Sequence, residues 1–295
     1  MIKRTLYFGN PAYLSCKLEQ MVVELRDNAD PTNNRTSTMP IEDIGVVVLD
    51  HPQITITHVL LQQLMNNNTA VITCNEKFMP AGLLLPLSGN TLQQERFEAQ
   101  LQASEPLRKQ MWQQTVKQKI ENQAAALKPR GVNIKNMLHW ADEVQSGDAQ
   151  NHEARAAAYY WGNFFPMVNE FRRDHDGMPP NNLLNYGYAI LRAIVARSLV
   201  GAGLLPTLGI HHHNRYNAYC LADDIMEPYR PYVDVIVHTM IERQGLVTEL
   251  GRNEKAALLQ IPVIDVVING ERSPLMLATQ QTAISVYRYC RLLRG

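Results

Sequence analysis

The chain changes character once along its length, close to Gly89. Upstream of this residue it consists of short apolar runs bounded by turn-forming residues, a pattern typical of β-strands. Downstream it is rich in Gln, Glu, Lys, Ala and Leu, which are good helix formers. We therefore expect an α+β protein whose domain boundary lies between Pro86 and Gln93. Residues 1–88 should form a small, sandwich-like β-rich domain, and residues 89–295 a larger all-α domain.

The expected elements follow the periodicity of the apolar residues. A short helix is predicted over residues 58–65, and a loop over residues 27–34, where Asp, Asn and Pro are concentrated. Strands are predicted over residues 5–8, 12–15, 21–25, 44–49, 70–74 and 79–86. Helices are predicted over residues 91–127, 136–141, 151–171, 183–203, 216–243, 254–259 and 274–293.

Charge is balanced overall but segregated locally. The 295 residues include 28 Lys and Arg and 28 Asp and Glu, so the net charge predicts no polyanionic partner. Between Arg108 and Lys135, however, basic residues are opposed only by Glu121. They form either a solvated helix face or, beside a metal site, a surface that contacts phosphates. These residues are Arg108, Lys109, Lys117, Lys119, Lys128, Arg130 and Lys135.

Cysteine usage and hydropathy favour a cytoplasmic protein. The cysteines are far apart and include no Cys-x-x-Cys pair, which favours reduced, buried thiols over disulfides or a zinc site. The N-terminus has no signal-peptide apolar region. The most apolar stretch, residues 189–210, contains Arg192, Arg197 and Pro206, which favours a buried helix over a membrane span. The cysteines are Cys16, Cys74, Cys220 and Cys290.

Glu153 is the most informative single residue. At helical spacing it shares a stripe with Ala157, Tyr160 and Phe164. A carboxylate on such a stripe is costly to bury unless a cation meets it. The alternative is a carboxylate that caps the start of its helix, but Asp148 or Asn151 could do that work. A cation-binding role is therefore open to Glu153.

Two further segments supply donors of the same kind. His211, His212 and His213 lie on a loop, and because adjacent residues point in different directions, one of them is expected to be a metal ligand. Asp224 and Glu227 are spaced to share one helix face, although an acidic cluster at a helix start is the alternative. One imidazole with two or three carboxylates suits Mg²⁺ or Mn²⁺ better than a closed zinc site.

Other charged residues lie in apolar surroundings. Asp234 could face the same site, but a buried partner such as an arginine is favoured. Arg155, Arg192 and Arg197 are embedded in otherwise apolar helices. They either snorkel to the surface, pair with buried acids, or contact phosphate.

Several segments resemble one known family. RTLYFGNPAYLS over residues 4–15 and MPIEDIGVVVLD over residues 39–50 resemble its N-terminal strands. LLNYGYAIL over residues 183–191 is the most specific match, followed by LGIHHH and DIMEPYRP within residues 208–231. By these motifs the whole chain resembles the CRISPR-associated spacer-acquisition integrases, the first-numbered proteins of those systems, in the form found in type II systems.

The resemblance implies a set of site residues. The family's metal ligands correspond to Glu153, His212 and Glu227, with His211 left as an alternative to His212. Asp224 corresponds to an acidic position close to the metal. Ala154 stands where the family often has Gly, a departure that removes no ligand.

The resemblance also implies an activity and partners. It predicts a homodimer that joins with a small second CRISPR-associated protein in a heterohexameric complex. That complex integrates 3′-hydroxyl ends of short foreign duplex DNA into the CRISPR repeat, with Mg²⁺ or Mn²⁺ as cofactor. The type II effector nuclease and an accessory protein are further expected partners. The competing hypotheses are a DNA-binding scaffold without catalysis and a metallo-phosphoesterase for small substrates, against which the basic run argues.

Overall fold

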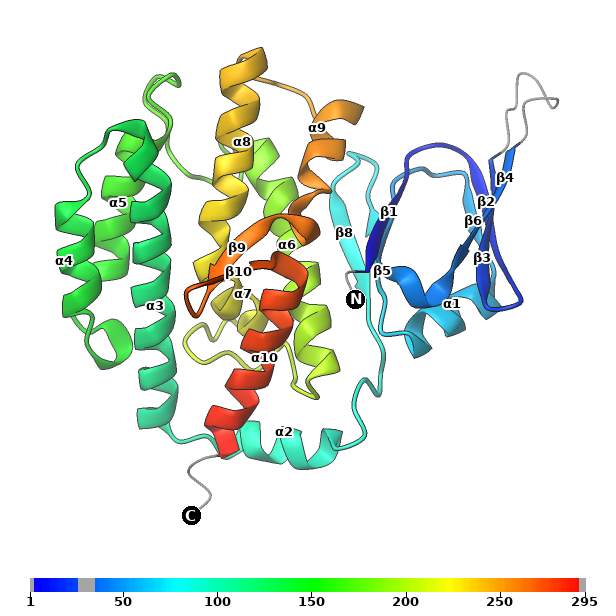
Figure 1. Ribbon diagram of the computed structural model, residues 1–295, viewed down its shortest axis with the longest axis horizontal. Helices are drawn as coiled ribbons and strands as arrows, with labels where there is room; N and C mark the ends of the chain where they lie inside the picture. Colours follow the sequence, from blue (N-terminus) through cyan, green and yellow to red (C-terminus); the bar gives the residue numbers. More distant parts are fainter. Residues whose placement is uncertain (1–2, 26–34, 292–295) are drawn as a thin grey trace.

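The computed structural model describes residues 3–25 and 35–291. The loop predicted over residues 27–34 lies outside these ranges. The predicted order of a strand-rich N-terminal region and a helical C-terminal region is confirmed (Figure 1). The N-terminal elements are β1 (Arg4–Phe8), β2 (Ala12–Lys17), β3 (Gln20–Leu25), β4 (Arg35–Pro40), η2 (Ile41–Asp43), β5 (Ile44–Leu49), β6 (Ile54–Ile56), α1 (His58–Asn66), β7 (Ala70–Cys74) and β8 (Pro80–Leu84).

The strands form two sheets that face each other. One sheet has the order β1-β5-β7-β8, and the other has the order β4-β3-β2-β6. A small apolar core that includes Leu14, Val47 and Leu60 lies between them. The strands β4 and β6 were not predicted. Their residues are largely polar or half-exposed, so the alternation that marks a strand is weak there.

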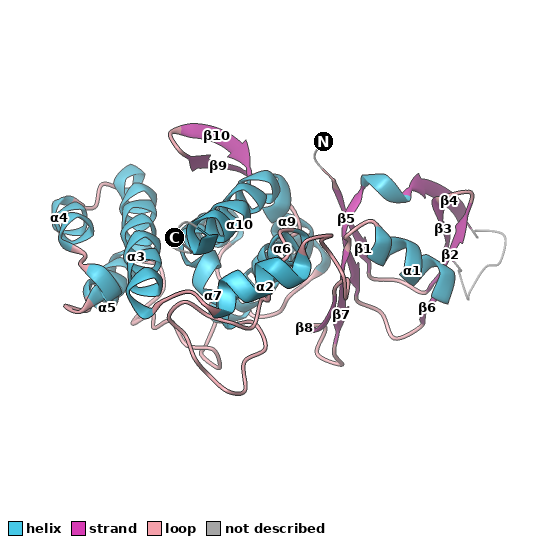
Figure 2. Cartoon of the chain, turned by 90° about the horizontal axis from the view of Figure 1, so that it is seen from below, coloured by secondary structure: helices cyan, strands magenta, loops and turns pink. Residues whose placement is uncertain are grey.

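The strand β5 is buried on both faces. Val47 belongs to the core of the sandwich, whereas Val46 and Val48 belong to the core of the helical part. This explains why β5 reads as a continuous apolar run rather than an alternating one. The sheet that contains β5 therefore lies between the second sheet and the helices, as Figure 2 shows.

A buried ion pair also joins the two parts. Lys255 Nζ lies 2.6 Å from Asp50 Oδ2, and both side chains are nearly inaccessible to solvent. The hydroxyl of Tyr7 donates a hydrogen bond of 2.5 Å to the same oxygen. Because Asp50 directly follows β5 and Lys255 lies on α9, this contact fixes the sheet against the helical part.

The helical region departs from the prediction in several places. The helix predicted over 91–127 is divided into two helices, Gln93–Leu101 and Glu105–Leu127. The helix predicted over 151–171 ends at Phe164, because Phe165 precedes a proline and leaves the helical conformation. The part of the chain predicted to be all-α also contains a β-hairpin, β9 (Asp265–Ile268) and β10 (Glu271–Pro274). The helices are α2 (Gln93–Leu101), α3 (Glu105–Leu127), α4 (Lys135–Glu143), α5 (His152–Phe164), α6 (Asn181–Gly201), α7 (Cys220–Met226), α8 (Arg230–Gln244), α9 (Arg252–Leu258) and α10 (Leu275–Arg291), with 3₁₀ turns η3 (Lys128–Arg130), η4 (Ser146–Asp148), η5 (Glu227–Tyr229) and η6 (Ile261–Val263).

The helix α6 lies at the centre of the helical part. Within the described residues, it is the one helix whose length and composition would allow it to cross a membrane. Yet 78% of its most apolar window is buried inside the protein. This agrees with the buried helix predicted from the arginines in this stretch.

Candidate metal centre

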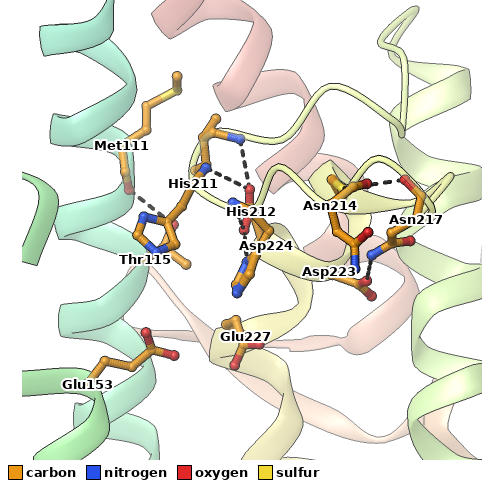
Figure 3. Close-up of polar contacts among 12 residues, drawn as sticks. Met111, Thr115, Glu153, His211, His212, Asn214, Asn217, Asp223, Asp224 and Glu227 are labelled. Carbon is orange, nitrogen blue, oxygen red and sulfur yellow. Dashed lines mark hydrogen bonds and ion pairs between the residues drawn. The ribbon is translucent and has the colours of Figure 1, made fainter. Parts of the chain in front are cut away.

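Glu153 lies in the first turn of α5. The start of this helix is fixed by Asp148, whose carboxylate accepts hydrogen bonds from the backbone N–H groups of His152 at 2.9 Å and Glu153 at 3.0 Å. Asp148 therefore does the capping, and the carboxylate of Glu153 points toward α3 and η5 (Figure 3). The buried residues of α5 are His152, Ala156, Tyr160 and Phe164. Glu153 and Ala157, predicted to share a stripe with Tyr160 and Phe164, are half-buried beside them.

The histidine loop is folded around one carboxylate. Asp224 of α7 is completely buried, and its oxygens accept hydrogen bonds from the N–H groups of Ile210 at 2.7 Å, His211 at 3.0 Å and His212 at 3.3 Å. The loop needs a glycine at Gly209, because a Cβ there would lie 2.2 Å from the carbonyl oxygen of His212. Asp224 and Gly209 together fix the path of the backbone that carries the histidines.

The same carboxylate orients the ring of His212. Asp224 Oδ1 lies 2.5 Å from His212 Nδ1, and this hydrogen bond raises the pKa of the imidazole. With Nδ1 engaged, Nε2 is the nitrogen left to bind another group, and Figure 3 shows the ring directed toward Glu227. Both oxygens of Asp224 already accept hydrogen bonds, so this residue is committed to the loop and to His212.

His211 has different surroundings. Its ring stacks on Trp112, with centroids 4.1 Å apart and planes within 3° of parallel. Burial lowers the pKa of this imidazole. The two neighbouring histidines are thus divided between an aromatic contact and the acidic centre.

Glu227 lies where the predicted helix over 216–243 is interrupted. The helix breaks into α7, η5 and α8, and Pro228 and Pro231 follow closely. Proline lacks the N–H that a helix interior requires, which accounts for the interruption. Burial would raise the pKa of Glu227, but Arg230 at 3.0 Å and Lys119 at 2.6 Å outweigh it and hold the pKa below its usual value.

Lys119 completes the centre and was not predicted. Its Nζ lies 2.6 Å from Glu153 Oε1 and 2.6 Å from Glu227 Oε2, and 12% of its side chain is exposed. The sequence grouped Lys119 with a basic run that contacts solvent or phosphate. Its spacing from the buried residues Trp112 and Val116 of α3 could have shown that it faces inward.

The donors fit a divalent cation, but the ammonium of Lys119 lies between them. Across residues 3–25 and 35–291, no group of three His, Cys, Asp or Glu side chains is arranged to hold a metal ion as it stands. Glu227 Oε2 is nevertheless buried, and its one polar contact among the described residues is the ion pair with Lys119 at 2.6 Å. Two carboxylates and an imidazole are suitable ligands for Mg²⁺ or Mn²⁺.

The other charged residues are mostly engaged within the protein. Lys117 pairs with Asp142 at 3.0 Å, and Arg130 packs over the ring of Phe164. Lys117 nevertheless remains 45% exposed, and contact of this run with phosphates stays a prediction. Arg108 lines a cavity of about 270 Å³ next to His212, together with Arg215.

The embedded arginines and Asp234 have varied partners. Arg192 pairs with Asp223 at 2.6 Å, as expected for a buried acid. Arg197 instead donates to the carbonyl oxygen of Asn68, and Arg155 is exposed. The arginine expected beside Asp234 is replaced by two hydroxyl donors, Tyr160 at 2.9 Å and Tyr188 at 2.5 Å.

Comparison with known proteins by sequence points to one family. A family model described as CRISPR associated protein Cas1 matches residues 6–261. A CRISPR-associated endonuclease Cas1 from Neisseria meningitidis serogroup C (strain 8013) is 38% identical over 262 residues, covering 88% of this chain and 83% of the relative.

Solved structures show the same fold. A casposase bound to integration product has a TM-score of 0.77 at 18% identity, over 98% of this chain and 90% of that chain. A chain of a Cas6-RT-Cas1–Cas2 complex has a TM-score of 0.73 at 19% identity, over 98% of this chain and 35% of that chain. With a family model that spans most of its length and a relative this similar, the chain belongs to the Cas1 family of CRISPR-associated proteins.

Proposed function

We propose that this protein is a metal-dependent DNA integrase and endonuclease of CRISPR adaptation. The observation that carries the proposal is that Glu153 and Glu227, from separate segments, contact one cation, the ammonium of Lys119, while the ring of His212 is directed toward Glu227. Membership of the Cas1 family and the endonuclease name of the Neisseria relative support it. The casposase, whose structure is described as bound to integration product, supports the integrase activity.

Glu153, His212 and Glu227 would hold Mg²⁺ or Mn²⁺. Such an ion, when bound, would polarise a phosphodiester, activate a 3′-hydroxyl and stabilise the leaving oxygen. Asp224 serves this site by fixing the ring of His212 through Nδ1, in the way that outer carboxylates orient metal-binding histidines. We therefore assign Asp224 a positioning role, in place of the direct ligand role that the sequence allowed.

Basic residues beside the centre would contact the phosphates of DNA. Arg108 and Arg215 line the cavity beside His212, where their guanidinium groups suit contacts with phosphate oxygens. The 47% exposure of the His212 side chain leaves the centre open on this side. Phosphoryl transfer depends on positioning and electrostatics, so no nucleophilic side chain is required. With water in place of the 3′-hydroxyl, the same residues would support hydrolysis.

The partners follow from the same proposal. The substrates are a short foreign duplex and the CRISPR repeat, and the protein acts as a homodimer bound to the small Cas2 protein in a heterohexamer. The chain in the Cas6-RT-Cas1–Cas2 complex supports a Cas2 partner. We further propose that the type II effector nuclease and an accessory protein take part.

The test is strand transfer of a short duplex with 3′-hydroxyl ends into a supercoiled plasmid that carries a CRISPR repeat. Cas2 and either Mg²⁺ or Mn²⁺ are added, and Glu153→Ala is compared with the wild type. We expect joined product from the wild type only, and duplex binding by both proteins. Glu121→Ala is the matched control, because Glu121 lies on α3 and contacts only Lys117 at 3.9 Å among the described salt bridges.

Each alternative has its own outcome. Retained joining by Glu153→Ala would refute the proposed centre. Duplex binding by the wild type without metal-dependent cleavage or joining would favour a DNA-binding scaffold. Hydrolysis limited to mononucleotides would favour a metallo-phosphoesterase for small substrates.

A further inference from the structure

Lys119 is the one residue of the centre whose position conflicts with the ion that the centre would bind. Its ammonium lies 2.6 Å from an oxygen of Glu153 and 2.6 Å from an oxygen of Glu227. Mg²⁺ binds carboxylate oxygens at about 2.0–2.1 Å. An ion held by the same two oxygens would therefore overlap the space that Nζ fills.

The two cations that contact Glu227 are not equivalent. Arg230 pairs with Oε1 at 3.0 Å, whereas Lys119 pairs with Oε2. Among the described residues, Oε2 has no partner other than Lys119, so it becomes free for another cation as soon as Lys119 leaves. Arg230 can stay in place during such an exchange, because it uses the other oxygen.

Lys119 is also the cation that can move. Its ammonium is carried on four methylene groups, each of which can rotate, and is well hydrated in water. The neighbouring His212 side chain is 47% exposed, so solvent lies close to the centre. Removing Lys119 from the carboxylates without replacing it would leave Glu153 without a cation and Glu227 with Arg230 alone, which is unfavourable in a partly buried site.

We propose that Lys119 is a positioning residue that holds Glu153 and Glu227 in place of the metal, and that metal binding displaces its ammonium. This inference rests on the proposed metal dependence of the site. The tethered cation lowers metal affinity because it competes for the same oxygens. It also keeps the two carboxylates close to each other until a metal ion binds.

The affinity test uses Mn²⁺ and the full-length protein. Binding is followed by the loss of the electron paramagnetic resonance signal of free Mn²⁺, which needs neither DNA nor activity. We expect Lys119→Met to bind Mn²⁺ about tenfold more tightly, because a competing charge has been removed. Lys119→Arg keeps the charge and should stay at or below the wild-type affinity. Lys117→Met, which changes an exposed lysine on the same helix, should equal the wild type.

A second measurement follows the ammonium itself in the wild-type protein. Acetylation of lysines by an N-hydroxysuccinimide ester is quantified by peptide mass spectrometry with and without Mn²⁺. We expect Mn²⁺ to accelerate modification of Lys119 and to leave Lys117 unchanged. This test does not depend on the folding of a variant.

The outcomes separate the two proposals. If the wild type binds Mn²⁺ but Lys119→Met binds no tighter, and Mn²⁺ leaves Lys119 acetylation unchanged, the displacement is refuted and the metal-dependent function stands. If neither the wild type nor Lys119→Met binds Mn²⁺, with both proteins folded by circular dichroism, the metal-dependent function fails and the displacement fails with it.

Discussion

Asp224 Oδ1 lies 2.5 Å from Nδ1 of His212, and the carboxylate that makes this contact is completely buried. The same carboxylate accepts hydrogen bonds from consecutive backbone N–H groups of the histidine loop. One side chain thus fixes both the path of the loop and the orientation of the imidazole. The geometry of the proposed metal centre depends on a residue that does not face the metal.

Replacing this carboxylate should weaken metal binding. In Asp224→Asn, the amide NH₂ group faces N–H donors, so hydrogen bonds to the loop or to His212 are lost. We expect Mn²⁺ affinity to fall about 10- to 100-fold and the free energy of unfolding to fall by about 1–3 kcal/mol. Titration followed by the electron paramagnetic resonance signal of free Mn²⁺ measures the affinity, and urea denaturation measures the free energy of unfolding. Unchanged Mn²⁺ affinity in the folded variant would contradict the positioning role.

The two neighbouring histidines should behave differently. His212→Ala removes the imidazole directed at Glu227 and should abolish detectable Mn²⁺ binding. His211→Ala removes a ring stacked on Trp112 and should leave Mn²⁺ affinity within about threefold of the wild type, a change of under 1 kcal/mol. The opposite ranking in the same titration would identify His211 as the ligand.

The ion pair between the sheet and α9 should matter for stability. Lys255→Met leaves the buried carboxylate of Asp50 without its cation, which should cost about 3–5 kcal/mol. The double variant Asp50→Asn with Lys255→Met should recover part of this loss, because no uncompensated charge remains. Urea denaturation gives the free energies of unfolding.

An exposed ion pair provides the control for this prediction. Lys109 and Glu105 are 2.7 Å apart, but both side chains are largely in solvent. Lys109→Met should change the free energy of unfolding by less than about 1 kcal/mol. Equal losses in Lys109→Met and Lys255→Met would show that burial does not decide the effect.

Asp234 should make stability depend on pH. Burial raises the pKa of this carboxyl to about 7, although the hydroxyls of Tyr188 and Tyr160 oppose the shift. Below about pH 4 the group is protonated in both the folded and unfolded states. Between about pH 4 and 7 the unfolded chain loses the proton while the folded protein keeps it, so stability falls as pH rises, by at most roughly 1.4 kcal/mol per pH unit.

The comparison with Asp234→Asn isolates this contribution. The amide has the same shape, can still accept from a tyrosine hydroxyl, and does not titrate. The free energy of unfolding of the wild type minus that of the variant should decline from pH 4 to 7 and then level off. Parallel pH profiles for the two proteins would show that Asp234 does not titrate in this range.

The sequence could predict the segments of the centre because each carries a local signal. Glu153 stood out on a helix with an apolar stripe, and the histidine run and the pair Asp224 and Glu227 stood out by composition. The structure brings these segments together. Their role as metal ligands stays a prediction.

The roles of Lys119 and Asp224 depend on contacts between distant segments. Lys119 on α3 is 34 residues from Glu153 on α5, and the two side chains meet between these helices. The sequence neighbours of Lys119 suggested a basic surface instead. The hydrogen bonds of Asp224 depend on the backbone path of a loop that has no periodicity. Spacing along the chain carries little information about either arrangement.

The hairpin within the helical part is a different case, because its signal was present. Asn269 and Gly270 have positive φ values of 53° and 79°, as a two-residue hairpin turn requires. An Asn-Gly pair that follows an apolar run is a strong hairpin signal, but no element was predicted between the helices expected over 254–259 and 274–293. The end of α5 before Pro166 could have been predicted in the same way.

The histidine side chains of the loop are exposed to solvent, whereas the backbone of the loop is hydrogen-bonded to the buried carboxylate of Asp224. The amides of Ile210, His211 and His212 all donate to a carboxylate that water does not reach. In hydrogen–deuterium exchange, these amides should therefore be protected like those of a helix, although they belong to a surface loop. Their exchange would report the separation of the loop from α7, an opening that would also release the ring of His212.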